Sequence, residues 1–262
     1  MGYEKVEIEI MDGVALVRLN DPTILNALSI QMVDELDDAL NQVTASARAM
    51  ILTAAGRAFC AGANLAGEVG SVAEDGLPDV GSVLETHINP LMNRLRSLSI
   101  PWISAVRGAA AGVGCSLALA ADLVIASESA YFLQAFARVG LVPDGGSSWL
   151  LARGAGRVRA MEMMLLGERL PAAKALEWGL INRVTGEDEL ESTALELAKG
   201  LAAGPTRSLA MIREAAWAGA DRDWDHALAT ERRLQREAGR TADHSEGVAA
   251  FLEKRAPRFT GA

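Results

Sequence analysis

The chain has 262 residues, of which 50% are hydrophobic and 23% are charged, so it can bury a sizeable core and is not expected to be disordered. Its formal net charge of -9 argues against nucleic acid as a partner, because phosphate binding needs clustered cations. Its two cysteines make no disulfide framework, and the charged N-terminus is not a signal peptide, so a reduced, cytoplasmic setting is expected.

The N-terminal part predicts a hairpin, a helix and a strand, in that order. Residues 3–10 and 14–20 alternate apolar and polar side chains around an Asp-Gly pair, which is typical of a β-hairpin. Residues 29–43 carry apolar side chains at helical spacing, with Ser29 as the expected N-cap. Residues 48–54 then form an apolar run that predicts a buried strand.

The middle of the chain continues the alternation of strands and helices. Residues 66–80 are rich in glycine and acids and predict a mobile loop, and residues 83–98 predict a helix. Residues 102–108 predict a strand that leads through a glycine-rich turn into a helix over 115–122. Residues 123–133 are expected to form two short strands that pair with each other.

The overall order of elements favours an α/β fold. The apolar run 108–126 contains several glycines and Asp122, so we expect it to divide into a helix and a strand and not to span a membrane. Past Pro143 the chain is mostly helical in its periodicity. We therefore predict an α/β core followed by a C-terminal third that is mostly helical.

Two turns built from small residues follow predicted strands and could carry chemistry. They occupy residues 59–65 and 108–117, and the second opens a helix, whose first N–H groups are unpaired at the positive end of the dipole. Backbone N–H groups from both turns, aimed at one point, would form an oxyanion hole. Tight packing of a helix on a strand, for which small residues also serve, is an equal alternative at this stage.

A single carboxylate, Asp144, stands between Pro143 and two glycines in an otherwise apolar segment. One interpretation is an N-cap, because an aspartate accepts hydrogen bonds from the free N–H groups that open a helix, and a helix is expected directly after it. The other interpretation is a catalytic acid or base. The local sequence is compatible with both.

Several motifs in order along the whole chain resemble the crotonase superfamily, also called the enoyl-CoA hydratase/isomerase family. They are "LNDPTILNALS", "GRAFCAGANL", "AVRGAAAGVGCSLALAADLVIAS", "RVGLVPDGG", "LPAAKALEWGLINRV" and "EGVAAFLEKRAPRF". The resemblance implies a spiral of ββα units, here over residues 1–200, and a helical C-terminal region over residues 201–262 that builds a homotrimer or homohexamer. It also implies an acyl-CoA thioester substrate, with coenzyme A as part of the substrate, no separate cofactor, and an enolate held by two backbone N–H groups.

The resemblance places the chemistry on a few residues. The two oxyanion donors correspond to the amides of Ala63 and Val113, the latter where many relatives carry glycine. The two glutamates with which hydratases of the family activate water correspond here to Ser116 and Phe136, so both carboxylates are absent. Asp144 matches the aspartate that serves as acid and base in the isomerase branch, which includes epoxyphenylacetyl-CoA and Δ3,Δ2-enoyl-CoA isomerases. Apolar neighbours are expected to raise its pKa.

Further residues are implied at the coenzyme A site. Arg57 and Lys254 match positions that hold phosphates or adenine, and Asn64 stands where relatives often have aspartate. Ser116 could hydrogen-bond the substrate or simply pack at the helix start. The three histidines lie far apart without ligand spacing and predict no metal site; we expect them at the surface. The other residues expected at the substrate are Leu25, Ala27, Ala61, Leu65 and Phe136; the histidines are His87, His226 and His244, and Cys60 and Cys115 are expected to be buried fillers.

Three functions are therefore carried forward. The first is an acyl-CoA isomerase that uses Asp144, because one carboxylate suffices for a 1,3-proton shift. The second is a hydratase or another lyase or hydrolase of the same family, with water held by other groups. The third is a non-catalytic acyl-CoA binder. The acyl group is not given by the sequence, although residues 66–98 are expected to line its pocket.

Overall fold

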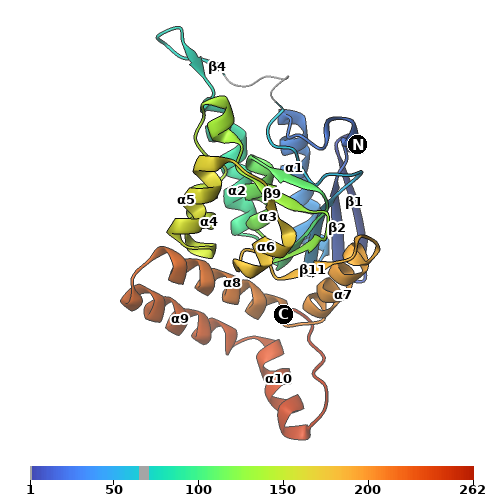
Figure 1. Ribbon diagram of the computed structural model, residues 1–262. Coiled ribbons are helices and arrows are strands. Elements are labelled where there is room, and N and C mark those ends of the chain that lie inside the picture. The colour runs from blue at the N-terminus through green and yellow to red at the C-terminus, as the bar shows by residue number, and fades with distance from the viewer. Residues whose placement is uncertain (1, 65–70) are drawn as a thin grey trace.

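A six-stranded sheet forms the centre of the computed structural model, which describes residues 2–64 and 71–262 (Figure 1). Its first two strands are an antiparallel hairpin, as predicted, and every later neighbour is parallel. This arrangement, with helices on the faces of a mostly parallel sheet, confirms the predicted α/β class. In sheet order the strands are β1 (Val6–Met11), β2 (Val14–Leu19), β3 (Ala49–Ala54), β6 (Trp102–Val106), β8 (Leu123–Ser127) and β11 (Arg183–Thr185).

A second, three-stranded sheet corrects one prediction. It consists of β10 (Leu170–Pro171), β9 (Tyr131–Leu133) and β7 (Ala109–Ala111). The expected pairing within residues 123–133 is therefore wrong, because β8 pairs with β6 and β11 while β9 pairs with β7 and β10. The polar break between β8 and β9 passes the chain from one sheet to the other, and a hairpin turn has the same local pattern.

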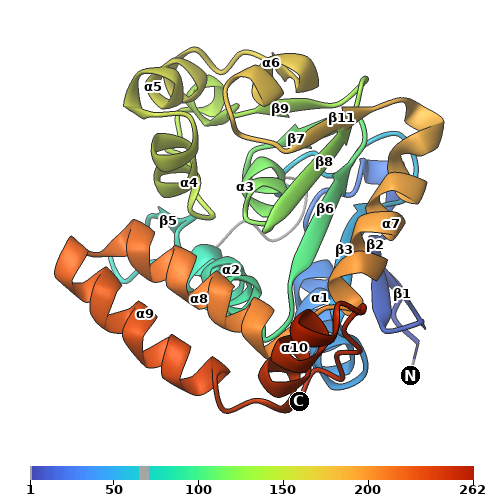
Figure 2. The same ribbon diagram turned by 90° about the horizontal axis from the view of Figure 1, so that it is seen from below.

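The large sheet buries both faces, which explains the apolar run in β3. Met50 and Leu52 belong to the core that includes helix α1 (Ile30–Ser46). The alternate residue Ile51 belongs to a second core that includes residues of helix α7 (Leu190–Ala202). Figure 2 shows α7 running alongside the sheet. The predicted cap of α1 is confirmed, because the Ser29 hydroxyl accepts a hydrogen bond from the backbone N–H of Met32 at 3.2 Å.

The segment predicted as one helix over residues 83–98 has two parts. A π-helical turn covers Leu84–Ile88, and α2 (Asn89–Arg96) follows it. Pro90 has no N–H to give the carbonyl four residues before it, and the N–H of Asn89 bonds to the carbonyl of Leu84, five residues back. Before this helix lies a short hairpin of β4 (Ser71–Val72) and β5 (Pro78–Asp79), inside the predicted loop.

The apolar run over 108–126 divides as expected. It forms β7, helix α3 (Val113–Leu119) and the start of β8. Within the described ranges, no helix combines the length and the apolar character that crossing a bilayer requires. The next helices are α4 (Ser147–Gly154), α5 (Arg157–Leu166) and α6 (Ala172–Glu177).

Three helices make up the C-terminal region: α8 (Thr206–Asp221), α9 (Trp224–Ala238) and α10 (Ala242–Glu253). Helices α8 and α9 run side by side below the core, and α10 extends beyond them (Figures 1 and 2). Arg213 of α8 is 6% exposed and joins this region to the core through the carboxylate of Asp122, at 2.6 Å, and the carbonyl of Leu95, at 3.0 Å. Few other side chains of α8–α10 are buried, so a large apolar surface stays exposed.

Candidate active site

A cavity of about 520 Å³ lies where the chain leaves the carboxyl ends of β3 and β6. In mostly parallel sheets, this edge is the usual place for a ligand. The walls of the cavity come from five segments that are far apart in sequence: residues 28–33, 61–64, 80–88, 111–113 and 135–144. Of residues 66–98, which were expected to line the acyl pocket, those between Val80 and Ile88 line this cavity, and residues 66–70 lie outside the described part of the chain.

The two small-residue turns lie against each other at the wall of this cavity. The N–H of Cys60 donates to the carbonyl of Ala109, and the N–H of Ala111 donates to the carbonyl of Cys60, both at 2.9 Å. A methyl group added to Gly62 would lie only 3.1 Å from the carbonyl oxygen of Ala111 in the second turn. A side chain there would crowd the second turn, so glycine at this position serves contact between the turns.

Each turn presents an amide after a glycine with positive φ. Gly62 has φ +106° and precedes Ala63, and Gly112 has φ +53° and precedes Val113. Within the described part of the chain, the N–H groups of Ala63 and Val113 donate to no partner. Val113 is the first residue of α3, where an amide has no intrahelical acceptor.

The orientation of the first turn follows from its bridge to Leu28. The N–H of Leu28 donates to the carbonyl of Gly62 at 2.7 Å, and the N–H of Asn64 donates to the carbonyl of Leu28 at 2.9 Å. In such a parallel bridge the N–H of Ala63 faces away from Leu28. Both Ala63 and Val113 line the cavity, so two unpaired donors are available to an oxygen inside it.

Asp144 lines the same cavity and is not a helix cap. Helix α4 begins at Ser147 with Gly146 at the N-cap, and no side chain caps it. The N–H of Ser147 donates instead to the backbone carbonyl of Asp144, at 3.0 Å. The carboxylate atom Oδ1 is buried and has no hydrogen-bond partner in the described part of the chain. The cap interpretation is therefore wrong, and the carboxylate is left available to a ligand.

The surroundings of Asp144 are apolar, as expected. Phe136 and Val142 line the cavity beside it, whereas Phe132 is fully buried and does not reach the cavity wall. Burial raises the pKa of Asp144 to about 6, because the charged form loses water and gains no compensating partner. A carboxyl group with this pKa can both take and return a proton near neutral pH.

All three histidines were predicted to lie at the surface, and this prediction is wrong for His87. His226 and His244 are exposed, but His87 lines the cavity and is the only titratable side chain besides Asp144 among its described lining residues. Its Nδ1 lies 2.7 Å from the hydroxyl of Thr86. His87 lies three or four residues from Val83 and Leu84, which line the same cavity, so the helical period of this segment already places it on the cavity-facing side.

The other residues expected at the substrate divide into two groups. Ala61, Asn64 and Phe136 line the cavity. Leu25, Ala27, Arg57, Ser116 and Lys254 do not line it, and Leu65 lies outside the described residues. Leu25 supports the first turn, since its carbonyl accepts from the N–H of Ala61 at 3.0 Å. Arg57 and Lys254 are exposed, and Lys254 ends α10.

Asn26 supports the site, and the sequence did not point to it. Asn26 is fully buried, and its side-chain amide donates to the carbonyls of Ala55 and Ala58, both at 2.8 Å. Its Oδ1 accepts the N–H of Asp21 at 2.8 Å. This residue therefore holds the segment before Leu28 against the segment that leads to the first turn. A buried asparagine has no periodic signature, so the sequence alone could not identify it.

The raised pKa predicts that Asp144→Asn stabilises the fold at pH 7.5. Between about pH 4 and pH 6 the native protein holds more protons at this site than the unfolded chain, so the free energy of unfolding falls as pH rises through this window. An asparagine at position 144 does not ionise, so the variant keeps the free energy of unfolding that the wild type loses as pH rises. Because the carboxyl group is partly exposed, we expect a gain of only about 1 to 2 kcal/mol at pH 7.5.

Urea unfolding of both proteins at pH 4 and pH 7.5 measures this difference. The gain should be full at pH 7.5 and much smaller at pH 4, which lies well below the native pKa of Asp144 and close to the pKa of the unfolded chain. A loss of about 1 kcal/mol, as removal of a helix cap produces, would contradict the assignment.

Comparisons with known proteins agree with this geometry. Residues 9–262 match the family model described as enoyl-CoA hydratase/isomerase. A 1,2-epoxyphenylacetyl-CoA isomerase of Escherichia coli is 46% identical over 252 residues, which cover 95% of each chain. A protein of Rhodobacter capsulatus described as a "probable enoyl-CoA hydratase" is 44% identical over 261 residues and 100% of both chains. The crystal structure of an enoyl-CoA hydratase from Bacillus anthracis has a TM-score of 0.91 at 32% identity, with 99% of this chain and 100% of the other covered.

Proposed function

Because this chain belongs to the enoyl-CoA hydratase/isomerase family, we propose that it is an acyl-CoA isomerase that shifts a double bond with Asp144 as its proton carrier. The observation that carries the proposal is that, among the described residues, a buried carboxylate without a hydrogen-bond partner lies on the wall of the same cavity as two amides that donate to no partner. Relatives of similar identity are described as an isomerase and as a hydratase, so their names support either chemistry.

The proposed reaction needs only these groups. The thioester oxygen accepts hydrogen bonds from the amides of Ala63 and Val113, and the Asp144 carboxylate takes a proton from C2. The electron pair of the broken C–H bond spreads over the enolate, whose oxygen carries the charge between the two amides. Asp144, now neutral, returns the proton to C4, and the double bond moves from C3–C4 to C2–C3. No atom is gained or lost.

Two features favour isomerisation over hydration. Addition of water to an enoyl thioester needs a general base and a general acid at the water. At the positions that the resemblance assigns to the two glutamates, Ser116 is buried away from the cavity and Phe136 presents an aromatic ring to it. The hydratase alternative would have to combine Asp144 with His87, since no other described residue of the lining titrates.

Steady-state kinetics with two substrates test the proposal. The kcat/KM for isomerisation of trans-3-hexenoyl-CoA should exceed that for hydration of crotonyl-CoA by about 100-fold or more, the usual contribution of a missing general acid–base group. Hydration as the faster reaction, with loss of that activity in His87→Gln, would establish the hydratase alternative instead. Binding of both thioesters without turnover of either would point to a non-catalytic binder.

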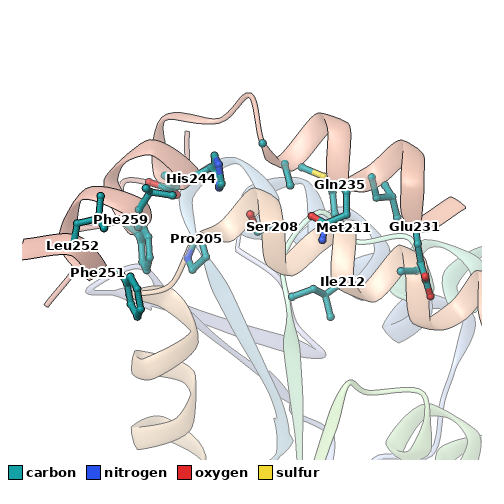
Figure 3. Close-up of a pocket in the computed structure, with 17 residues that line it drawn as sticks. Pro205, Ser208, Met211, Ile212, Glu231, Gln235, His244, Phe251, Leu252 and Phe259 are labelled. Atoms are coloured by element: carbon teal, nitrogen blue, oxygen red, sulfur yellow. The ribbon is translucent and has the colours of Figure 1, made fainter. Parts of the chain in front are cut away.

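We further propose that α8–α10 pack between copies of the chain as a trimer or a dimer of trimers. A groove of about 870 Å³ lies between these helices, with Ile212, Phe251 and Leu252 at its rim (Figure 3). These three side chains are 62%, 82% and 73% exposed, which is unusual for large apolar residues. A contiguous apolar surface of this kind is typical of a protein–protein interface.

The assembly proposal predicts that Phe251→Asp produces monomers. A charge placed in the centre of an apolar contact between subunits would remain buried without a partner. Light scattering at micromolar concentration should give three or six chain masses for the wild type and one for the variant. Val158→Asp is the matched control, because Val158 is also exposed, at 73%, but lies on α5 outside the groove. A monomeric wild-type protein would contradict the proposal.

A further inference from the structure

A chain of buried hydrogen bonds ends on the backbone of Asp144. The Ser116 hydroxyl lies 2.9 Å from the carbonyl oxygen of Asp144 and 2.5 Å from the hydroxyl of Ser147. The side-chain amide of Gln134 donates to the same Ser147 hydroxyl at 2.9 Å. Ser116 is 1% exposed, Gln134 and Ser147 are fully buried, and none of the three lines the cavity.

The direction of every bond in this chain is determined. A carbonyl oxygen only accepts, so Ser116 must donate its hydroxyl proton to Asp144. The Ser147 hydroxyl must then donate to Ser116, and it accepts from Gln134. The backbone carbonyl of Asp144 consequently accepts hydrogen bonds from two donors, the Ser116 hydroxyl and the N–H of Ser147. The carboxylate of Asp144 accepts none in the described part of the chain.

The same region leaves no space for movement of the turn toward α3. Gly145 has φ +58°, and a methyl group at this position would lie 3.0 Å from a methyl of Val113 and 3.1 Å from Cβ of Ser116. The turn that carries Asp144 is therefore pressed against the first turn of α3, which also carries the Val113 amide. Ser116 is both small enough for this contact and polar enough to bond across it.

We propose that Ser116 is a positioning residue, and this proposal rests on the proposed isomerase function. The hydrogen bond from Ser116 to the backbone carbonyl fixes the turn that carries Asp144, and it thereby keeps the carboxylate unpaired at the cavity wall. The described part of the chain makes no hydrogen bond to the side chain of Asp144. Its position thus depends on its backbone, and Ser116 supplies the side-chain bond to that backbone.

Ser116→Ala tests this role. The alanine keeps the packing but removes the donor, so we expect kcat to fall about 10-fold with KM within about twofold, since small displacements of a reacting group reduce the rate without loss of binding. Ser127→Ala is the matched control, because Ser127 is fully buried and its hydroxyl also pairs with a serine, Ser129, at 3.1 Å, outside the cavity. It should leave kcat and KM unchanged.

A titration separates this role from the proposed function. The carboxyl carbon of Asp144, assigned by its absence in Asp144→Asn, is followed by NMR against pH. In Ser116→Ala the midpoint should fall toward the ordinary aspartate range, because the freed turn lets the carboxylate reach water. A lower midpoint in a protein whose wild type isomerises nothing would support the positioning role and reject the isomerase.

An unchanged midpoint and an unchanged kcat in Ser116→Ala would overturn the proposal. If that variant does not fold, Ser116→Cys gives the same test, because a thiol fills the space but is a weak donor. His87 is the one other titratable side chain among the described lining residues, and it is unaltered in Ser116→Ala, Ser116→Cys and Ser127→Ala.

Discussion

Asp144→Asn should lower the kcat for isomerisation of a 3-enoyl-CoA by about 100- to 10,000-fold, the contribution that a positioned general base makes. Asparagine has nearly the same size and shape, but it cannot take the proton from C2. The affinity for the acyl-CoA should stay within a few fold, because the carboxylate makes no hydrogen bond that the described part of the chain would lose. Single-turnover rates and equilibrium binding measure the two effects separately.

A matched control is Asp188→Asn, which removes an exposed carboxylate outside the cavity. It should leave both rate and affinity unchanged. Near-normal turnover in Asp144→Asn would show that the catalytic group lies elsewhere, and His87 would be the next side chain to examine because it lines the same cavity.

Gly112→Ala should lower kcat by about 100- to 1,000-fold, which is the effect of losing one oxyanion-hole donor. Gly112 has φ +53° and ψ -130°, a conformation that a residue with a side chain rarely adopts. An added methyl group would also lie 3.6 Å from the Phe136 ring. We expect the peptide to rotate and to turn the N–H of Val113 away from the thioester oxygen.

Gly156→Ala controls for the cost of the backbone conformation alone. Gly156 also has positive φ, +81°, but a methyl group there meets nothing within 4 Å, and the residue does not line the cavity. Both variants should lose stability, and only Gly112→Ala should lose catalysis. If enolate formation, measured as exchange of the C2 proton with solvent, is normal in Gly112→Ala, the amide of Val113 is not an oxyanion donor.

The sequence predicted those elements whose side-chain period is regular over many residues. The hairpin and helix α1 follow from alternation and from a 3.6-residue period, and both are confirmed. Strand β7 consists of three alanines, which have little strand preference, and it could not be predicted from its own composition. The pairing of β8 and β9 failed for a related reason, because local patterning does not say which sheet a strand joins.

The site was predictable only through the resemblance of ordered motifs. The local sequence around Asp144 fits a helix cap and a catalytic acid equally well, and only the start of α4 at Ser147 distinguishes them. His87 shares a helical face with Val83 and Leu84, so the spacing of this segment could have pointed to it. The bond from Ser116 to the Asp144 carbonyl, by contrast, joins segments 28 residues apart, and no spacing along the chain encodes it.

Proton NMR of one reaction in deuterated water tests the central claim, that Asp144 carries a proton from C2 to C4 of an enoyl thioester. With trans-3-hexenoyl-CoA, the wild type should yield the 2-enoyl thioester, with the arriving hydrogen or deuterium at C4 and no 3-hydroxyacyl product. Asp144→Asn should leave the substrate unchanged over the same time. Accumulation of the 3-hydroxyacyl thioester by the wild type, or conversion by Asp144→Asn at the wild-type rate, would contradict the account.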